Sequence, residues 1–126
     1  MELSGILIGS EDPEGLANYY TKLFGEPGWS DGGYFGWMMG SATVMIGPHD
    51  QVKGKNPEPG RVIWNLETPD VKGDFERLRG MGAIVVREPY DPSQNDPGGD
   101  DPGSEMLIAT LADPDGNYFQ LASPWK

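Results

Sequence analysis

The feature that most constrains the fold of this chain is an internal repeat. A short apolar strand at 3–9 is followed by a helix start at Asp12, and the same order returns at 61–67 and Asp70, 58 positions later. In each half the helix has one apolar face, ends at a glycine and is followed by short segments typical of strands. The sequence therefore predicts an α+β fold of two β-α-β-β-β modules. A module below roughly 70 residues rarely buries a stable core, so the two complete each other or pair across subunits.

The repeat sets the expected domain organisation. We expect a single domain over 1–126, with module one at about 1–47, a polar linker at 48–60 and module two at about 61–126. In the two helices the corresponding positions, in order, are Asp12, Tyr20, Leu23 and Gly25 in module one and Asp70, Phe75, Leu78 and Gly80 in module two. The remaining strands are expected near Trp29 and at 34–39, 43–47, 83–87, 106–112 and 118–122, with a tight turn at 113–117 before the last of them.

Charge and composition exclude several classes of function. The 126 residues carry 20 acidic and 9 basic side chains, for a formal charge of -11, so nucleic acid and anionic membrane surfaces are not expected partners. The chain has no cysteine and one histidine, which excludes disulfides, thiolate metal sites and sites that need two imidazoles. The apolar run at 6–8 is too short for a signal peptide or a membrane span. We therefore expect an acidic cytoplasmic protein.

The stretch 88–105 departs from the repeat because it is acidic, proline-rich and nearly free of apolar residues. One interpretation is a solvated loop. The other is a flap over a pocket or a weak cation site, and its ligands would be Asp91, Asp96, Asp100 and Asp101. The sequence leaves both interpretations open.

Three motifs carry a resemblance to a known family. The last turn and strand, Asp-Pro-Asp-Gly-Asn-Tyr-Phe-Gln-Leu-Ala-Ser-Pro at 113–124, is the most specific of them. The helix end Tyr-Tyr-Thr-Lys-Leu-Phe-Gly at 19–25 and the helix entry Thr-Pro-Asp-Val at 68–71 join it. Together with the duplicated module, they resemble the vicinal oxygen chelate superfamily, which includes glyoxalases, bleomycin-resistance proteins and extradiol dioxygenases. The resemblance implies a mixed sheet curled around a cleft, with the helices on its outer face.

The resemblance also implies where a metal would be held. Metal-dependent members use a His or Gln near the start of each module and a Glu on the last strand of each, which correspond here to Gly5, Ile63, Met45 and Gln120. Only Gln120 offers an oxygen, and one neutral amide does not replace several charged oxygens or imidazoles. We therefore expect no metal and no cofactor, unless a different alignment brings in Glu67 or His49.

The cleft is then predicted to be an apolar and aromatic binding site. Indole and phenol rings stack on planar or cationic ligands, although any one of these rings could equally fill the core. Asn65 and Gln120 are the polar groups expected to orient the ligand, and a Gln that only satisfies neighbouring backbone is the alternative. The predicted ligand-binding residues are Leu7, Trp37, Met45, Trp64, Asn65, Tyr118 and Gln120.

Three functions remain open. The preferred one is a metal-free, homodimeric, bleomycin-resistance-like protein that binds a small apolar or aromatic molecule, with cations favoured by the charge of -11. The second is a glyoxalase-like isomerase, lyase or dioxygenase, either metal-free or with Gln120, Glu67 and His49 as metal ligands. The third is an interaction or regulatory domain whose cleft is occluded by its own side chains.

Overall fold

The computed structural model describes residues 1–92 and 106–124. Contacts divide the chain into two compact units: unit one comprises 1–57 and 113–116, and unit two comprises 58–112 and 117–126. The elements of unit one are β1 (Gly5–Ser10), α1 (Pro13–Phe24), β2 (Trp29–Asp31), β3 (Tyr34–Met39) and β4 (Ala42–Pro48). Those of unit two are the 3-10 turn η1 (Pro59–Arg61), β5 (Ile63–Glu67), α2 (Val71–Gly80), β6 (Ile84–Tyr90), β7 (Ile108–Ala112) and β8 (Tyr118–Ala122).

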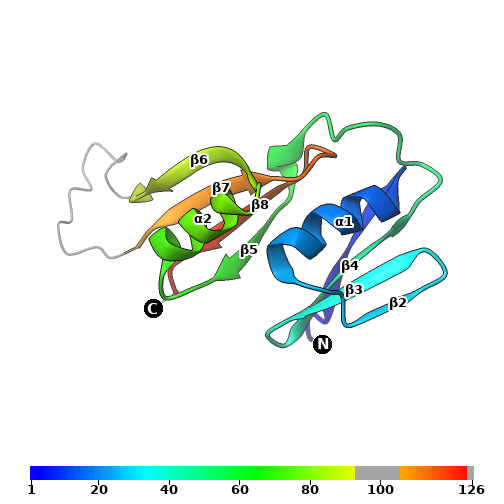
Figure 1. Cartoon of the computed structure of the whole chain (residues 1–126), viewed down its shortest axis with the longest axis horizontal. Helices are drawn as coiled ribbons and strands as arrows, with labels where there is room; N and C mark the ends of the chain where they lie inside the picture. The colour runs from blue at the N-terminus through cyan, green and yellow to red at the C-terminus, as the bar shows by residue number, and fades with distance from the viewer. Residues whose placement is uncertain (93–105, 125–126) are drawn as a thin grey trace. The chain divides into compact units, whose positions relative to one another are not determined.

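The two units have the same topology, which confirms the predicted pair of βαβββ modules. The sheet of unit one has the strand order β1-β4-β3-β2, and the sheet of unit two has the order β5-β8-β7-β6. In each sheet the first and last strands of the module are parallel neighbours and the other pairs are antiparallel. One helix lies against one face of each sheet (Figure 1). No helix in the described ranges is long and apolar enough to cross a membrane.

The repeat is also visible in how the two helices begin. The carboxylate of Asp12 accepts a hydrogen bond from the Gly15 N–H at 3.1 Å, and that of Asp70 accepts one from the Gly73 N–H at 3.0 Å. Each carboxylate thus satisfies one of the unpaired donors at a helix N-terminus. A Cβ at Gly15 or Gly73 would lie 2.3 or 2.1 Å from an oxygen of the capping aspartate. In the repeated Asp-x-x-Gly, the glycine therefore lets the capping carboxylate lie close to the helix backbone.

The second helix ends at Gly80, as the repeat predicts. The residue with positive φ in the turn that follows α2 is Gly82, at 101°. The N–H of Ala83 donates to the Leu78 carbonyl at 3.0 Å and closes the turn. In module one the prediction is confirmed, since Gly25 has φ 89° directly after α1.

Each helix buries an apolar stripe against its own sheet. The strand residues that meet it are the alternate ones, as the period-two pattern predicts: Val44 and Ile46 in unit one, Phe119 and Leu121 in unit two. The buried helix residues are Leu16, Ala17, Tyr20 and Leu23 in α1 and Val71, Phe75 and Leu78 in α2. The opposite face of each sheet, here called the helix-free face, is not covered by the helix of its unit.

The turn between β7 and β8 belongs to unit one and is held there by a buried polar network. Tyr20 Oη donates to Asp113 Oδ2 at 2.7 Å, and Asp113 is only 2% exposed. The other carboxylate oxygen of Asp113 accepts from the Asp115 N–H at 2.9 Å, and Ser10 Oγ donates to Asp115 Oδ2 at 2.6 Å. The first half of the most specific sequence motif therefore joins the turn to β1 and α1.

Tyr20 is expected to make the stability of the protein sensitive to alkaline pH. Burial, and then the charge of the Asp113 carboxylate, raise the pKa of its hydroxyl above the ordinary value. A group with a raised folded-state pKa contributes stability that is complete below its unfolded pKa, here about 10, and is lost as pH rises above it. We expect this loss to be about 1.4 kcal/mol per pH unit.

Urea titrations at several values between about pH 9 and about pH 11.5 test this, with Tyr20→Phe as the matched variant. Above about pH 10, the free energy of unfolding of the wild type should fall more steeply with pH than that of the variant. The difference in slope should be that of one titrating proton, about 1.4 kcal/mol per pH unit. Parallel curves for the two proteins would contradict the assignment.

Candidate functional site

The helix-free face of unit one carries a row of side chains that crosses all four strands. Trp29 pairs with Gly36, Gly36 with Met45, and Met45 with Leu7, so these four residues stand side by side. Paired residues in neighbouring strands point to the same face of a sheet. Leu7 is 53% exposed and Trp29 is 44% exposed. The row is therefore an apolar surface that the helix does not cover.

Two aromatic rings on this face lie over glycines. A Cβ at Gly36 would lie 2.5 Å from Cε2 and Nε1 of Trp29, and one at Gly47 would lie 2.3 Å from Cδ1 and Cε1 of Tyr34. The indole and the phenol thus occupy the space that a larger side chain would fill. Both rings remain more than one third exposed. The two glycines therefore let the rings lie close against the strands.

The polar groups of this face are few. Asp31 pairs with Tyr34 on this face. In the described part of unit one, no other strand residue paired on the helix-free face is charged. Thr43 Oγ1 donates to Met38 Sδ at 3.2 Å, and Met38 is 64% exposed. The face therefore combines exposed apolar and aromatic side chains with one negative charge.

The helix-free face of unit two is polar at the equivalent row. Asn65 pairs with Gln120, Gln120 with Thr110, and Thr110 with Arg87. Gln120 Nε2 donates to Thr110 Oγ1 at 3.3 Å, and Asn65 Nδ2 donates to the Ile63 carbonyl at 3.4 Å. Two amides, a hydroxyl and a guanidinium thus share one line across the sheet.

The predicted ligand-binding residues fall into two groups. Leu7 and Met45 lie together on the helix-free face of unit one. Asn65 and Gln120 lie together on that of unit two, and Tyr118 is on the same face, paired with Ile63. Two of these five residues therefore share one sheet face in unit one, and the other three share one sheet face in unit two.

Trp37 and Trp64 lie on the other side of their sheets. Trp37 is 4% exposed, and its Nε1 donates to the Gly25 carbonyl at 2.8 Å. Trp64 stacks on Phe119, with the ring centroids 5.1 Å apart. Both side chains therefore pack on the helix side of their sheets. Trp64 precedes Asn65 in β5, so strand alternation puts the two side chains on opposite faces.

Trp29 and Arg87 are absent from the predicted set, although each stands in one of the two rows. A signal for both exists in the repeat, because Trp29 and Arg87 are 58 positions apart, as are Leu7 and Asn65. The two rows are equivalent parts of the duplicated module. One has become apolar and the other hydrogen-bonding.

The model of the glyoxalase-like domain family matches residues 5–122. The chain belongs to the glyoxalase-like domain family. This confirms the predicted membership of the vicinal oxygen chelate superfamily. Solved structures of other proteins share the fold. One is a glyoxalase-related enzyme from Fulvimarina pelagi, with 21% identity and a TM-score of 0.70 over 98% of this chain and 88% of that one. Another is a glyoxalase/bleomycin resistance protein from Albidiferax ferrireducens T118, with 18% identity and a TM-score of 0.69 over 98% of each chain.

A relative of this glyoxalase-like chain is an uncharacterized protein of Mycolicibacterium smegmatis. The two are 23% identical over 127 residues, which cover 99% of this chain and 96% of the relative. Similarity at these levels supports the fold of the whole chain and leaves activity to be argued from its own residues.

The metal-ligand positions of the superfamily fit a metal poorly in this glyoxalase-like domain. The first is Gly5, where a Cβ would lie 2.2 Å from the Thr43 carbonyl oxygen, so the backbone of β4 excludes any side chain there. Met45 and Ile63 offer no donor suited to a hard or borderline cation. Gln120, the fourth, offers one neutral amide oxygen, and its Nε2 donates to Thr110. The expectation of a metal-free protein remains a prediction that this donor set favours.

The other suggested ligands belong to different units. Glu67 pairs with Ala122 in unit two, whereas His49 follows β4 in unit one, is exposed and accepts a hydrogen bond from the Gln51 N–H at 3.1 Å. No group of three His, Asp or Glu suited to a metal is present in residues 1–92 and 106–124. Of the acidic residues suggested for the 88–105 stretch, only Asp91 lies in the described residues. Asp96, Asp100 and Asp101 lie outside them.

Proposed function

We propose that this glyoxalase-like protein binds a small planar molecule, apolar or aromatic and preferably cationic, on the helix-free face of unit one. The observation that carries the proposal is the pair of exposed rings, Trp29 and Tyr34, each lying over a glycine. The role does not require a metal. It is a binding role, and the geometry assigns no reacting group.

The chemistry of the face supports this ligand class. Planar molecules stack on the flat sides of exposed indole and phenol rings. Met38 and Met45 add flexible, polarizable contact surface that adapts to different ligand shapes. A cation gains further attraction from the face of an indole, worth about 0.5–2 kcal/mol, and from the Asp31 carboxylate. The charge of -11 adds long-range attraction for cations.

We propose in addition that the protein acts as a homodimer in the cytoplasm. A homodimer accords with modules that are each too small to bury a sufficient core alone. A chain without cysteine has no disulfide to form in an oxidising compartment.

Fluorescence titration with 9-aminoacridine, a planar cation, tests the ligand class. We expect quenching of tryptophan emission in the wild type and a loss of affinity of about tenfold in Trp29→Ala, because stacking on one ring contributes about 1–2 kcal/mol. Asp31→Asn should weaken the cation several-fold and leave neutral acridine unchanged.

Trp64→Phe is the matched control, since it removes a tryptophan from the helix side of the other sheet. It should leave the affinity for 9-aminoacridine unchanged. Equal loss in the two tryptophan variants, or no response to either compound, would overturn the proposed function.

A further inference from the structure

The polar row of unit two is placed by two irregularities in β6. Val85 pairs with Leu111, yet Arg87 pairs with Thr110, and the register shifts again between Arg87 and Tyr90. In a regular antiparallel ladder the residue opposite Thr110 would be Val86. A β-bulge adds one residue to a strand and turns the following side chain to the other face. The first shift therefore brings a guanidinium, in place of a valine, beside Thr110 on the helix-free face.

The second shift supplies the surface on which this guanidinium rests. Tyr90 pairs with Ile108, two residues from Thr110, and so lies on the same face as Arg87. The Cζ of Arg87 is 3.4 Å from the centre of the Tyr90 ring. A guanidinium stacked on a ring still has its N–H donors around its edge, where they can bind a carboxylate through two parallel hydrogen bonds.

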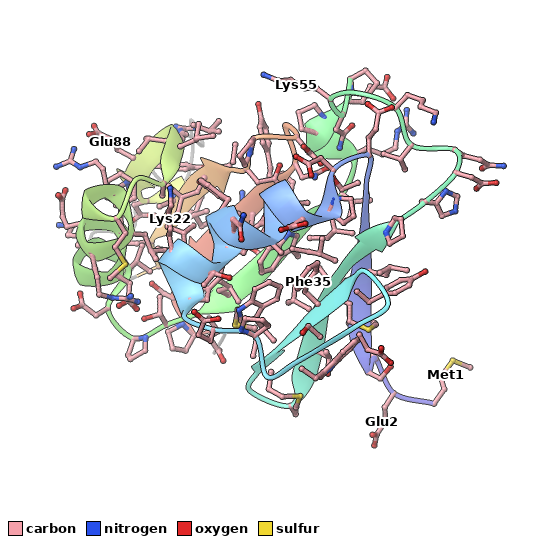
Figure 2. All side chains as sticks on the ribbon, turned by 45° about the vertical axis from the view of Figure 1, so that its right-hand side comes forward. Met1, Glu2, Lys22, Phe35, Lys55 and Glu88 are labelled. Carbon is pink, nitrogen blue, oxygen red and sulfur yellow. The ribbon has the colours of Figure 1, made fainter. Side chains whose placement is uncertain are left out.

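The nearest acidic residue in sequence is engaged elsewhere. Glu88 Oε1 lies 3.7 Å from Nη1 of Arg79, a residue of α2, so Glu88 is directed toward the helix side of the sheet. Figure 2 labels Glu88 on β6, near α2. Among the described residues, no carboxylate lies within salt-bridge distance of Arg87. Within the described residues, the Arg87 guanidinium is therefore available to bind an anion.

The rest of the row can complete such a site. Thr110, 7% exposed, forms its floor and accepts the Gln120 amide hydrogen bond, so its own hydroxyl proton is available to an acceptor. The amides of Gln120 and Asn65 follow on the next two strands, at about 4.8 Å per strand. The row thus begins with the cationic guanidinium on β6 and ends with the two side-chain amides on β8 and β5, which can each donate or accept a hydrogen bond. Glu67, also on this face, is on β5, at the opposite edge from Arg87.

We propose that this row, Arg87, Thr110, Gln120 and Asn65, is a binding site for the carboxylate of a small organic acid. Arg87 holds the carboxylate, Thr110 donates to it, and the two amides bind the polar atoms next to it. The flanking residues Ile84, Ala112 and Ile108 provide apolar contact on either side of the row. The site is on unit two and does not depend on the aromatic face of unit one.

Side-chain NMR of the full, isotope-labelled chain tests the proposal, with benzoate as the probe and benzamide as its neutral counterpart. Benzoate should shift the side-chain signals of Arg87, Gln120 and Asn65, whereas benzamide should bind at least tenfold more weakly. Arg87→Gln should weaken benzoate about tenfold or more, and Gln120→Met a few-fold, with the backbone spectrum of each variant showing that it is folded.

Arg77→Gln is the matched control, because Arg77 is an exposed arginine on α2 that pairs with Asp74. It removes the same charge and should leave benzoate affinity unchanged. Equal weakening in the two arginine variants, equal binding of benzamide, or tighter binding of inorganic phosphate than of benzoate would overturn the carboxylate site.

Discussion

Replacing Asp113 with alanine is expected to lower the free energy of unfolding by about 3 kcal/mol. The carboxylate accepts hydrogen bonds from the Tyr20 hydroxyl at 2.7 Å and the Asp115 N–H at 2.9 Å, in a site that is 2% exposed. Its removal leaves two donors in a dry environment, and an unsatisfied buried polar group costs about 1–3 kcal/mol. Urea denaturation at neutral pH, followed by circular dichroism, measures the change.

Two variants control for charge and for the hydroxyl. Asp50→Ala removes an acidic side chain that is 93% exposed and should change stability by less than about 0.5 kcal/mol. Tyr20→Phe leaves the Asp113 carboxylate with one partner fewer and should cost about half as much as Asp113→Ala. A loss below about 1 kcal/mol in Asp113→Ala would contradict the role of the network.

Gly5→Ala is expected to destabilise the protein by about 2 kcal/mol, the usual cost of forcing extra volume into a closed space. The new Cβ would lie 2.2 Å from the Thr43 carbonyl oxygen and 3.1 Å from its carbon, both of them backbone atoms. A flexible side chain could turn away, but the backbone of β4 is held by pairing on both sides. Thermal unfolding and urea titration measure the effect.

The matched control is Gly80→Ala, at the last residue of α2, where a Cβ would have nothing within 4 Å. Alanine is the better helix former, so this variant should be neutral or stabilised by up to about 1 kcal/mol. Similar behaviour of the two variants would show that β1 can move away from β4. The same obstacle faces a histidine at position 5, so this chain could not regain the family's first metal ligand by one substitution.

The fold was largely predictable because its signals are local. The capping aspartates and the apolar helical faces identify two copies of one module, and alternation along each strand separates Val44 and Ile46 from Met45. These patterns follow from the periods of helix and strand, which do not depend on distant contacts. The end of α2 at Gly80 agrees with the repeat, but a pattern of glycines does not reveal which one takes positive φ, and in the structure this is Gly82.

The candidate sites were only partly predictable. Leu7, Met45, Asn65 and Gln120 follow from alternation, and their register confirms the face on which each lies. Arg87 does not follow from alternation, because a bulge changes the face of every residue beyond it. Only its spacing of 58 positions from Trp29 in the repeat indicates its place.

The sequence by itself determined the duplicated α+β module, the helix starts, the acidic surface and the absence of suitable donors at three of four metal positions. Tertiary structure decided which aromatic rings are core and which are surface, since Trp37 and Trp29 have the same chemistry and lie on opposite faces of one sheet. It also decided that the 113–116 turn belongs to unit one, through the contact of Tyr20 with Asp113. The physical reason is the same in both cases. A residue's partners across strands and turns depend on register, and register is set by pairing between segments far apart in the chain.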